Sequence, residues 1–179
     1  IALVADARIH METRDNGVWA IGNIAGTNHS FRMLLLDHGC LPHMVQFLAD
    51  CTLRHYDPSN CLWAIGNLYR TLDGERPTDP LPFLTVLPSV LQHSTLSAET
   101  VRSALFLLEE LVTTPMCVRL MGDHGQLYAA RHFVLWCLER SWDTLQTMEI
   151  RHTTLRIVCA MARVCVHRDQ VLGTLHCVD

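Results

Sequence analysis

The sequence repeats itself, and this repetition restricts the possible folds more than any other feature. The residues Trp19-Ala-Ile-Gly-Asn23 recur unchanged as Trp63-Ala-Ile-Gly-Asn67, 44 positions further along. A second motif, Asp37-His38-Gly39, recurs as Asp123-His124-Gly125 after 86 positions, which is two steps of 43. Two independent motifs therefore indicate one period. A period of this length is typical of stacked HEAT or armadillo helical repeats and of WD40 propeller blades.

The local hydrophobic pattern favours helices over blades. Apolar residues have helical spacing in the two copies of the motif, and the alternation of a propeller strand is missing. The predicted helices are Gly17–Ala25, Phe31–Asp37, Leu41–Ala49, Ser59–Leu68, Leu81–Gln92, Glu99–Val112, Leu127–Glu139 and Thr153–Val164. We expect each glycine at a break to end a helix in a left-handed turn. The predicted breaks are Gly26–Asn28, His38–Gly39, Asp57–Pro58, Asp73–Pro80, Thr114–Pro115 and His124–Gly125.

We therefore predict an all-α fold, a right-handed superhelical solenoid of armadillo repeats that forms a single domain over residues 1–179. Residues 1–12 are expected to end one repeat, and 13–56, 57–97 and 98–145 to form the next three. A truncated repeat then covers 149–179, after an insertion between Glu139 and Met148. Because the chain opens within the pattern at Ile1, we expect it to be a fragment of a longer protein. Repeats of this kind bury their apolar faces against their neighbours.

Composition argues against several functional classes. The formal net charge is −4 and no basic stripe is visible, so direct nucleic-acid binding is not expected. No apolar run reaches the roughly 18 residues that a membrane span requires. The eight cysteines are scattered without a CxxC pair, which favours small buried side chains over a disulfide framework.

Catalytic and metal signatures are also weak. Cys40 and His43, with His38 nearby, lack the second pair that a tetrahedral zinc site needs. Glu109 and Glu110 are adjacent, so on a helix they point in different directions and do not form a carboxylate pair. No glycine-rich phosphate loop is present. We predict that the chain is not an enzyme and holds no cofactor or metal.

The repeated Trp and Asn are the candidate functional residues. Positions i and i+4 share one face of a helix, which places Trp19 beside Asn23 and Trp63 beside Asn67. An Asn carboxamide can bond both the C=O and the N–H of an extended peptide backbone. A Trp ring offers a shelf for a Lys or Arg stem, worth roughly 0.5–2 kcal/mol. The alternative is a core Trp with a capping Asn, but recurrence in register with the repeat favours a peptide-binding groove.

The chain resembles the importin alpha family along most of its length. Val18 to Gly26 resembles the family's third repeat. Asn60 to Arg70, followed by the Pro-rich stretch Pro77–Pro82 and Leu87-Pro88-Ser-Val-Leu, resembles the fourth. Glu99–Thr114 resembles the fifth repeat, and Thr154-Leu-Arg156 resembles the sixth, where the family replaces the groove Trp by Arg.

This resemblance implies a groove that binds nuclear localisation signals. The positions implied to contact the peptide are Trp19, Asn23, Asn60, Trp63, Asn67, Arg70, Glu99 and Arg156. Glu99 takes the place of an acidic groove residue that would pair with a cargo lysine. The implied partners are cargo proteins with basic localisation peptides, and importin beta through a segment outside this chain. The implied location is shuttling between cytoplasm and nucleus.

The sequence also departs from the family pattern. Thr27 stands where the family has an Asp that pairs with the key cargo lysine. In the fifth repeat the groove pair becomes Phe106 and Glu110, or Leu105 and Glu109 after a one-residue slip. Ser103 replaces an acidic residue there, and Ala160 replaces the Asn of the sixth repeat. An importin-alpha-like scaffold for a different, less basic extended peptide is therefore the alternative function.

Overall fold

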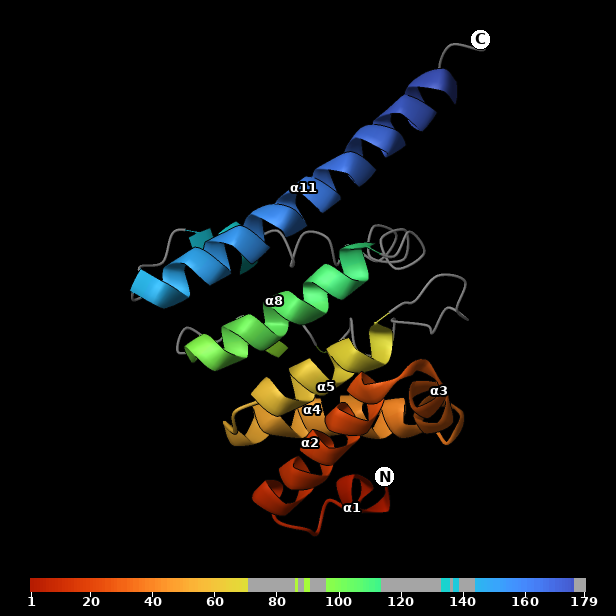
Figure 1. The fold of residues 1–179 in the computed structure, drawn as a ribbon, viewed down its shortest axis with the longest axis vertical. Coiled ribbons are helices and arrows are strands. Elements are labelled where there is room, and N and C mark those ends of the chain that lie inside the picture. The colour runs from red at the N-terminus through yellow and green to blue at the C-terminus, as the bar shows by residue number, and fades with distance from the viewer. Residues whose placement is uncertain are drawn as a thin grey trace.

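The computed structural model describes residues 1–70, 86, 89–90, 96–113, 133–135, 137–138 and 144–175, with the side chains of the last segment described from 148 to 163. Helix is the only regular secondary structure in these ranges. The helices are α1 (Ala2–Ala5), α2 (Met11–Thr27), α3 (His29–Asp37), α4 (Cys40–Arg54), α5 (Ser59–Tyr69), α8 (Ala98–Thr113) and α11 (Thr144–Leu175) (Figure 1). The predicted all-α class is confirmed.

Each predicted helix that falls in the described residues lies within an observed one, and most of the observed helices are longer. The predictions for Leu81–Gln92 and Leu127–Glu139 lie mainly outside the described residues, as does the Pro-rich stretch. The short helix α1 was not predicted. α2 begins at Met11 and α11 at Thr144, so the predicted repeat boundaries near 12 and 148 fall inside helices. The repeat boundaries were placed from the spacing of the repeated motifs, which does not show where a helix begins.

The glycine at position 39 behaves as predicted, whereas that at 26 does not. Gly39 has φ 69°, a left-handed conformation, between α3 and α4. Gly26 lies inside α2, which continues to Thr27. The break comes at Asn28, whose side chain accepts a hydrogen bond from the N–H of Phe31 (3.0 Å) and so caps α3. The prediction that Gly26 ends a helix is therefore wrong.

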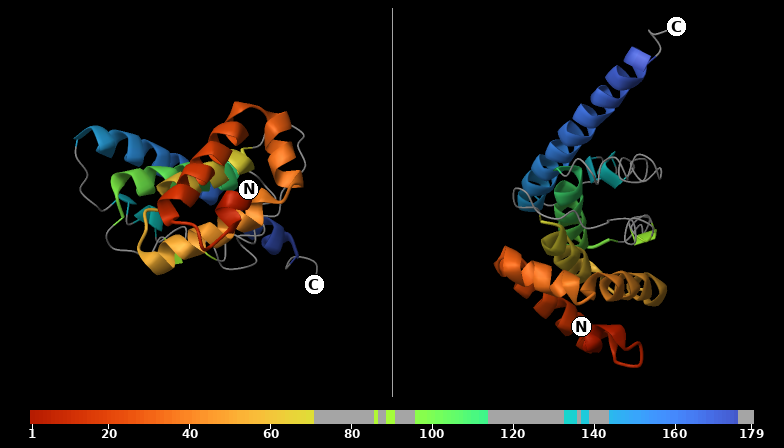
Figure 2. Two further views of the ribbon diagram at one scale, coloured as in Figure 1. Left: turned by 90° about the horizontal axis from the view of Figure 1, so that it is seen from below. Right: turned by 90° about the vertical axis from the view of Figure 1, so that its right-hand side faces the viewer.

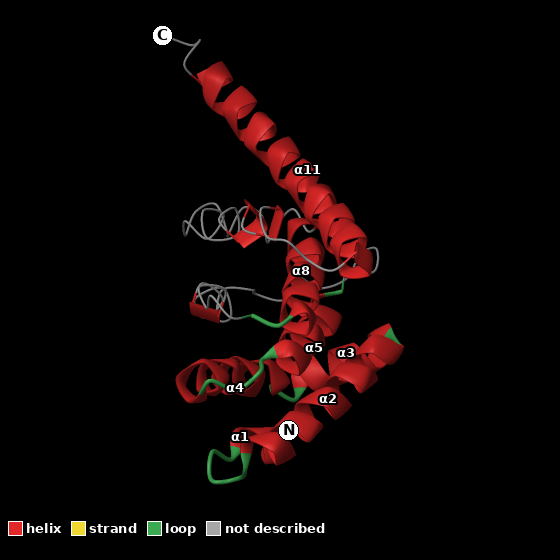
Figure 3. Ribbon diagram, turned by 90° about the vertical axis from the view of Figure 1, so that its left-hand side faces the viewer, coloured by secondary structure: helices red, strands yellow, loops and turns green. Residues whose placement is uncertain are grey.

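Four of the described helices form a stack. α2, α5, α8 and α11 follow one another up the molecule (Figure 1), and in sequence each packs on the next. α4 lies to one side of this stack, as the side views show (Figures 2 and 3). α5 has neighbours on both sides and is buried along most of its length. Its core residues include Leu62 and Ile65, both with no exposed surface.

Two buried arginines connect helices at the N-terminal end of the stack. Arg14 of α2 donates from Nε to the carbonyl oxygen of Val4 (2.9 Å) and from Nη1 to Asp50 of α4 (2.8 Å), and it lies over the Phe47 ring. Arg32 of α3 donates to the carbonyl oxygens of Ala25 (3.3 Å) and Arg70 (2.6 Å). These carbonyls lie at the C-terminal ends of α2 and α5, where a cation is favourable.

None of the helices that the structure describes combines the length and the apolar character needed to cross a membrane.

Candidate functional site

An aromatic side chain lies at equivalent places on α2, α5 and α8, and two of the rings rest on a glycine of the preceding helix. A Cβ added to Gly22 would lie 2.5 Å from Cζ3 of Trp63. A Cβ added to Gly66 would lie 2.6 Å from Cε1 of Phe106. The ring of Trp63 therefore packs against Gly22 of α2, and the ring of Phe106 packs against Gly66 of α5. Trp19 begins this row and is 55% exposed.

The same contact settles the register on α8. Phe106 rather than Leu105 occupies the position of the Trp, since Leu105 is buried in the core. The residue four positions further is then Glu110, on the same face as Phe106. The predicted register with Phe106 and Glu110 is confirmed.

The two asparagines of the motif differ in their surroundings. Asn23 is exposed, and its Nδ2 donates to the carbonyl oxygen of Trp19 (3.0 Å). Asn67 is only 2% exposed, and its Nδ2 donates across to the carbonyl oxygen of Gly22 (3.2 Å). Both asparagines were predicted to face a peptide-binding groove, and Asn67 lies there only as a buried side chain that bonds the neighbouring helix. Each amide keeps a second N–H and an acceptor oxygen beyond the bond given.

Asn60 joins two helices rather than lining the face beside Trp63. Its Nδ2 donates to Oδ2 of Asp15 on α2 (2.8 Å). Asp15 is partly buried, and this burial raises the pKa of its carboxyl group, although the Asn60 bond acts in the opposite direction. The structure thus places Asn60 in a contact between repeats, at the N-terminal end of α5.

A hollow of about 350 Å³ lies beside Trp63, between the C-terminal halves of α2 and α5. It is lined by Gly22, Asn23, Gly26, Thr27, Trp63, Asn67 and Arg70. Four of the predicted contact residues therefore meet at one place. Gly26 contributes space, because a Cβ there would lie 3.3 Å from Nδ2 of Asn67. A side chain at position 26 would therefore crowd the Asn67 amide.

Two ion pairs connect α8 with the helices on either side of it. Nε of Arg70 lies 3.8 Å from Oε1 of Glu110, and the guanidinium lies 5.4 Å from the centre of the Phe106 ring. Burial raises the pKa of Glu110, while the nearby Arg70 charge lowers it. On the next helix Arg156 donates from Nη2 to Glu109 (3.1 Å). The adjacent Glu109 and Glu110 therefore point to different partners, on α11 and α5.

Glu99 lies apart from these residues. It is exposed in the first turn of α8 and pairs with Arg102 on the same helix. Eleven residues of helix separate it from Glu110, which corresponds to about 16 Å. The structure therefore does not bring Glu99 to the hollow.

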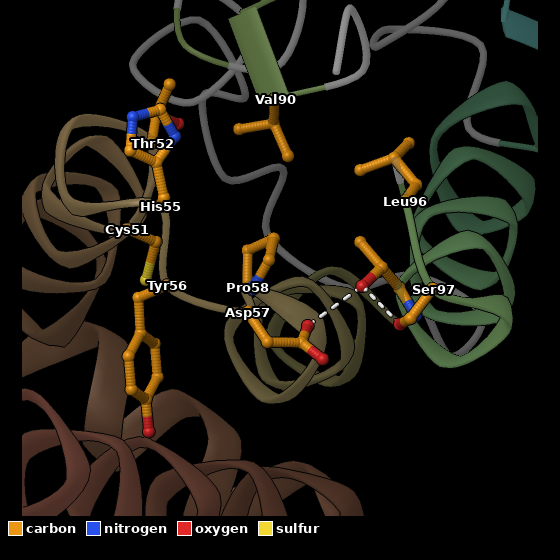
Figure 4. Close-up of a pocket in the computed structure, with 10 residues that line it drawn as sticks. Cys51, Thr52, His55, Tyr56, Asp57, Pro58, Val90, Leu96 and Ser97 are labelled. Carbon is orange, nitrogen blue, oxygen red and sulfur yellow. Dashed lines mark hydrogen bonds between the residues drawn. The ribbon is translucent and has the colours of Figure 1, made fainter. Parts of the chain in front are cut away.

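A second hollow, of about 210 Å³, lies at the other end of α5 (Figure 4). Its walls come from the turn after α4, from Val90 and from the residues that start α8. Asp57 accepts hydrogen bonds there from the hydroxyl of Thr100 (2.8 Å) and from the N–H of Ser59 (2.9 Å). Through these hydrogen bonds Asp57 connects the start of α5 with the start of α8.

The described cysteines show the expected burial except for one. Cys40, Cys51, Cys61 and Cys137 are buried, whereas Cys159 is exposed. Burial raises the pKa of Cys40 to about 11 and that of Cys51 to about 12. Across the described part of the chain, no group of three His, Cys, Asp or Glu side chains is arranged to hold a metal ion.

Stacked helices with a row of rings seated on glycines define the class of protein as an α-helical repeat solenoid. The repeat is of the armadillo type: the structure is similar to that of a designed armadillo repeat protein in complex with the peptide (KR)4. The TM-score is 0.67 at 20% sequence identity, and the match covers 89% of this chain and 62% of the designed protein. The predicted armadillo fold is confirmed. No protein-family model matches the sequence.

Proposed function

We propose that this chain binds an extended peptide along the face formed by α2, α5 and α8, as an adaptor of the importin alpha kind. The observation that carries the proposal is the row of Trp19, Trp63 and Phe106, with two rings seated on the preceding helix. Rings at one position per repeat would offer an extended ligand a regular series of contacts. The ligand of the designed protein, (KR)4, is a basic peptide and supports this choice.

On this proposal the ligand is the basic localisation signal of a cargo protein. Trp19 and Trp63 provide shelves for Lys or Arg stems, and Asn23 bonds the peptide backbone. Importin beta would then bind through a segment outside these residues, and the protein would shuttle between cytoplasm and nucleus.

A titration of the full chain with a fluorescent Lys-rich peptide tests the proposal. Trp19→Ala is the best variant because the side chain is 55% exposed, so its loss leaves the core unchanged. One lost shelf, at roughly 0.5–2 kcal/mol, should weaken binding about two- to thirtyfold. The matched control is Leu53→Ala, an apolar residue on α4 with 78% exposure that lies off this face. Equal binding by the two variants would contradict the proposal.

A less basic ligand is the second candidate function, and the charges of the site favour it. Glu110 and Glu109 already face Arg70 and Arg156, so a ligand lysine would compete with those guanidinium groups. Thr27 offers a hydroxyl, which donates to the carbonyl oxygen of Asn23 (2.9 Å). A peptide with Ala in place of its central Lys separates the two candidates. Unchanged affinity favours the less basic ligand, whereas a loss of tenfold or more favours the localisation signal.

A further inference from the structure

The hollow beside Trp63 has a single charged group among its described lining residues, and that group is Arg70. Thr27 contributes a hydroxyl, and Asn23 and Asn67 contribute amides. Among the described residues, the lining thus contains one cationic group and several hydrogen-bonding groups but no carboxylate. A lysine that entered this hollow would be repelled by the Arg70 guanidinium, which already engages the neighbouring carboxylate of Glu110.

Arg70 is held in place from two sides. Its carbonyl oxygen accepts a hydrogen bond from Arg32 (2.6 Å), and its guanidinium lies over the Phe106 ring. Nε of Arg70 lies 3.8 Å from Oε1 of Glu110, and a guanidinium has five N–H donors, more than one carboxylate can engage. A guanidinium that is ordered in advance loses less entropy when it binds an anion.

The cation is also the more accessible partner of its pair. The side chain of Arg70 is 42% exposed, against 19% for Glu110. The same relation holds between Arg156 and Glu109, where the arginine is again the more exposed partner. At two successive steps along the face, therefore, a ligand meets the guanidinium before it meets the carboxylate.

We propose that the hollow between α2 and α5 selects an anionic side chain of the bound peptide, either the carboxylate of Asp or Glu or the phosphate of a phosphorylated Ser. This inference rests on the proposed peptide-binding function and adds the charge required at one ligand position. The planar fork of Arg70 matches the oxygens of a carboxylate or a phosphate. Basic ligand residues would flank this position on the Trp shelves, so the preferred ligand has mixed charge.

A peptide scan with the full chain tests the inference. Each peptide of a Lys-rich series carries one Asp at a different position, and its control carries the uncharged isostere Asn there. We expect one position at which the Asp peptide binds roughly three- to tenfold more tightly than the Asn peptide, as for a partly exposed ion pair. At that position, phosphoserine compared with Ser shows whether a phosphate is preferred to a carboxylate.

Three variants assign the effect to the hollow. Arg70→Gln should remove the difference between the Asp and Asn peptides. Glu110→Gln should keep or enlarge it, because the recessed carboxylate no longer competes for Arg70. Arg102→Gln is the matched control, since this arginine of α8 pairs with Glu99 away from the hollow.

The outcomes separate the two proposals. If no peptide of the series binds, the proposed peptide-binding function fails. If the peptides bind but no position prefers Asp to Asn, or if Glu110→Gln abolishes the preference, the inference about the hollow is overturned and peptide binding stands. Circular dichroism shows whether Arg70→Gln folds, and if it does not, Glu110→Gln decides.

Discussion

Asp15 is a carboxylate held between two repeats, and its surroundings disfavour its charge. Oδ2 accepts a hydrogen bond from Asn60 on α5 (2.8 Å). Burial is the main reason that its pKa is raised, and the negative charge of Asp57 adds to the effect. Such a group stabilises the fold less when ionised than when protonated. Its contribution therefore depends on pH.

Asp15→Asn should become more stable relative to the wild type as the pH rises. Below the ordinary pKa of about 3.8 both folded and unfolded Asp15 are protonated, so no penalty exists. As pH rises from there through the raised pKa, the folded protein binds more protons than the unfolded chain and loses stability. Asn keeps an acceptor for Asn60 and does not titrate. Urea unfolding of both proteins between pH 3.5 and 7 measures the difference.

Asp6→Asn provides the control of opposite sign. The hydrogen bonds from Arg8 lower the pKa of Asp6 to about 2. Its stabilisation is therefore present above the ordinary value of 3.8 and is lost as the pH falls towards 2, so its unfolding series is extended below pH 3.5. A constant difference between Asp15→Asn and the wild type over the whole range would show that the raised pKa has no role in stability.

Residue roles were only partly predictable from the sequence. Recurrence identified Trp19, Asn23, Trp63 and Asn67, and the last three line the hollow. Sequence could not show that Asn67 and Asn60 bond neighbouring helices, because an amide binds a protein carbonyl or carboxylate as readily as it binds a ligand. Burial separates these cases, and burial depends on how the repeats stack.

At the scale of helices, the glycines of the repeated motif set the distance between neighbours. Gly22 and Gly66 lie inside α2 and α5, where glycine lowers helix stability by about 1 kcal/mol relative to alanine. They allow the rings of Trp63 and Phe106 to approach the helix backbone. The helices themselves were predictable from their apolar period of 3.6. The contacts between rings and glycines were not predictable, since a glycine that ends a helix and a glycine that packs against a ring look alike in sequence.

Gly22→Ala should destabilise the protein despite its better helix propensity. The new Cβ would lie 2.5 Å from the Trp63 ring and 2.9 Å from Cβ of Ala64, so the ring must leave its seat. Overpacking of this kind costs about 1–3 kcal/mol. Chemical unfolding followed by Trp fluorescence measures both the loss and the altered ring environment.

The control for this variant is Gly17→Ala on the same helix. Its nearest neighbours are Cδ2 of Leu3 at 3.0 Å, the end of a flexible side chain that can turn aside, and Cγ2 of the buried Val4 at 3.1 Å, and both contacts are looser than those at Gly22. We expect a smaller change in stability than for Gly22→Ala. If both variants lose the same free energy of unfolding, the seat of Trp63 has no special importance.

At the scale of the whole molecule, the described helices of the stack pack most extensively on their neighbours in the stack, and α5 also contacts α3 and α4. α5 packs on α2 and α8, whereas α11 packs on α8 within the described residues. Such a solenoid behaves as a chain of coupled units rather than as one globular core. A defect should therefore spread to adjacent helices and weaken with distance along the stack.

Ile65→Ala in α5 and Ile157→Ala in α11 test this behaviour with the same chemical change. Both side chains are fully buried, so each substitution should cost roughly 2–5 kcal/mol. Hydrogen exchange followed by mass spectrometry reports the protection of each helix separately. Ile65→Ala should expose the amides of α2, α5 and α8, because α5 contacts both neighbours.

Ile157→Ala should expose the amides of α11 and α8 and leave those of α2 protected. If both variants instead reduce protection evenly along the chain, the stack unfolds as one cooperative unit, and the face that carries Trp19 and Trp63 cannot loosen in parts.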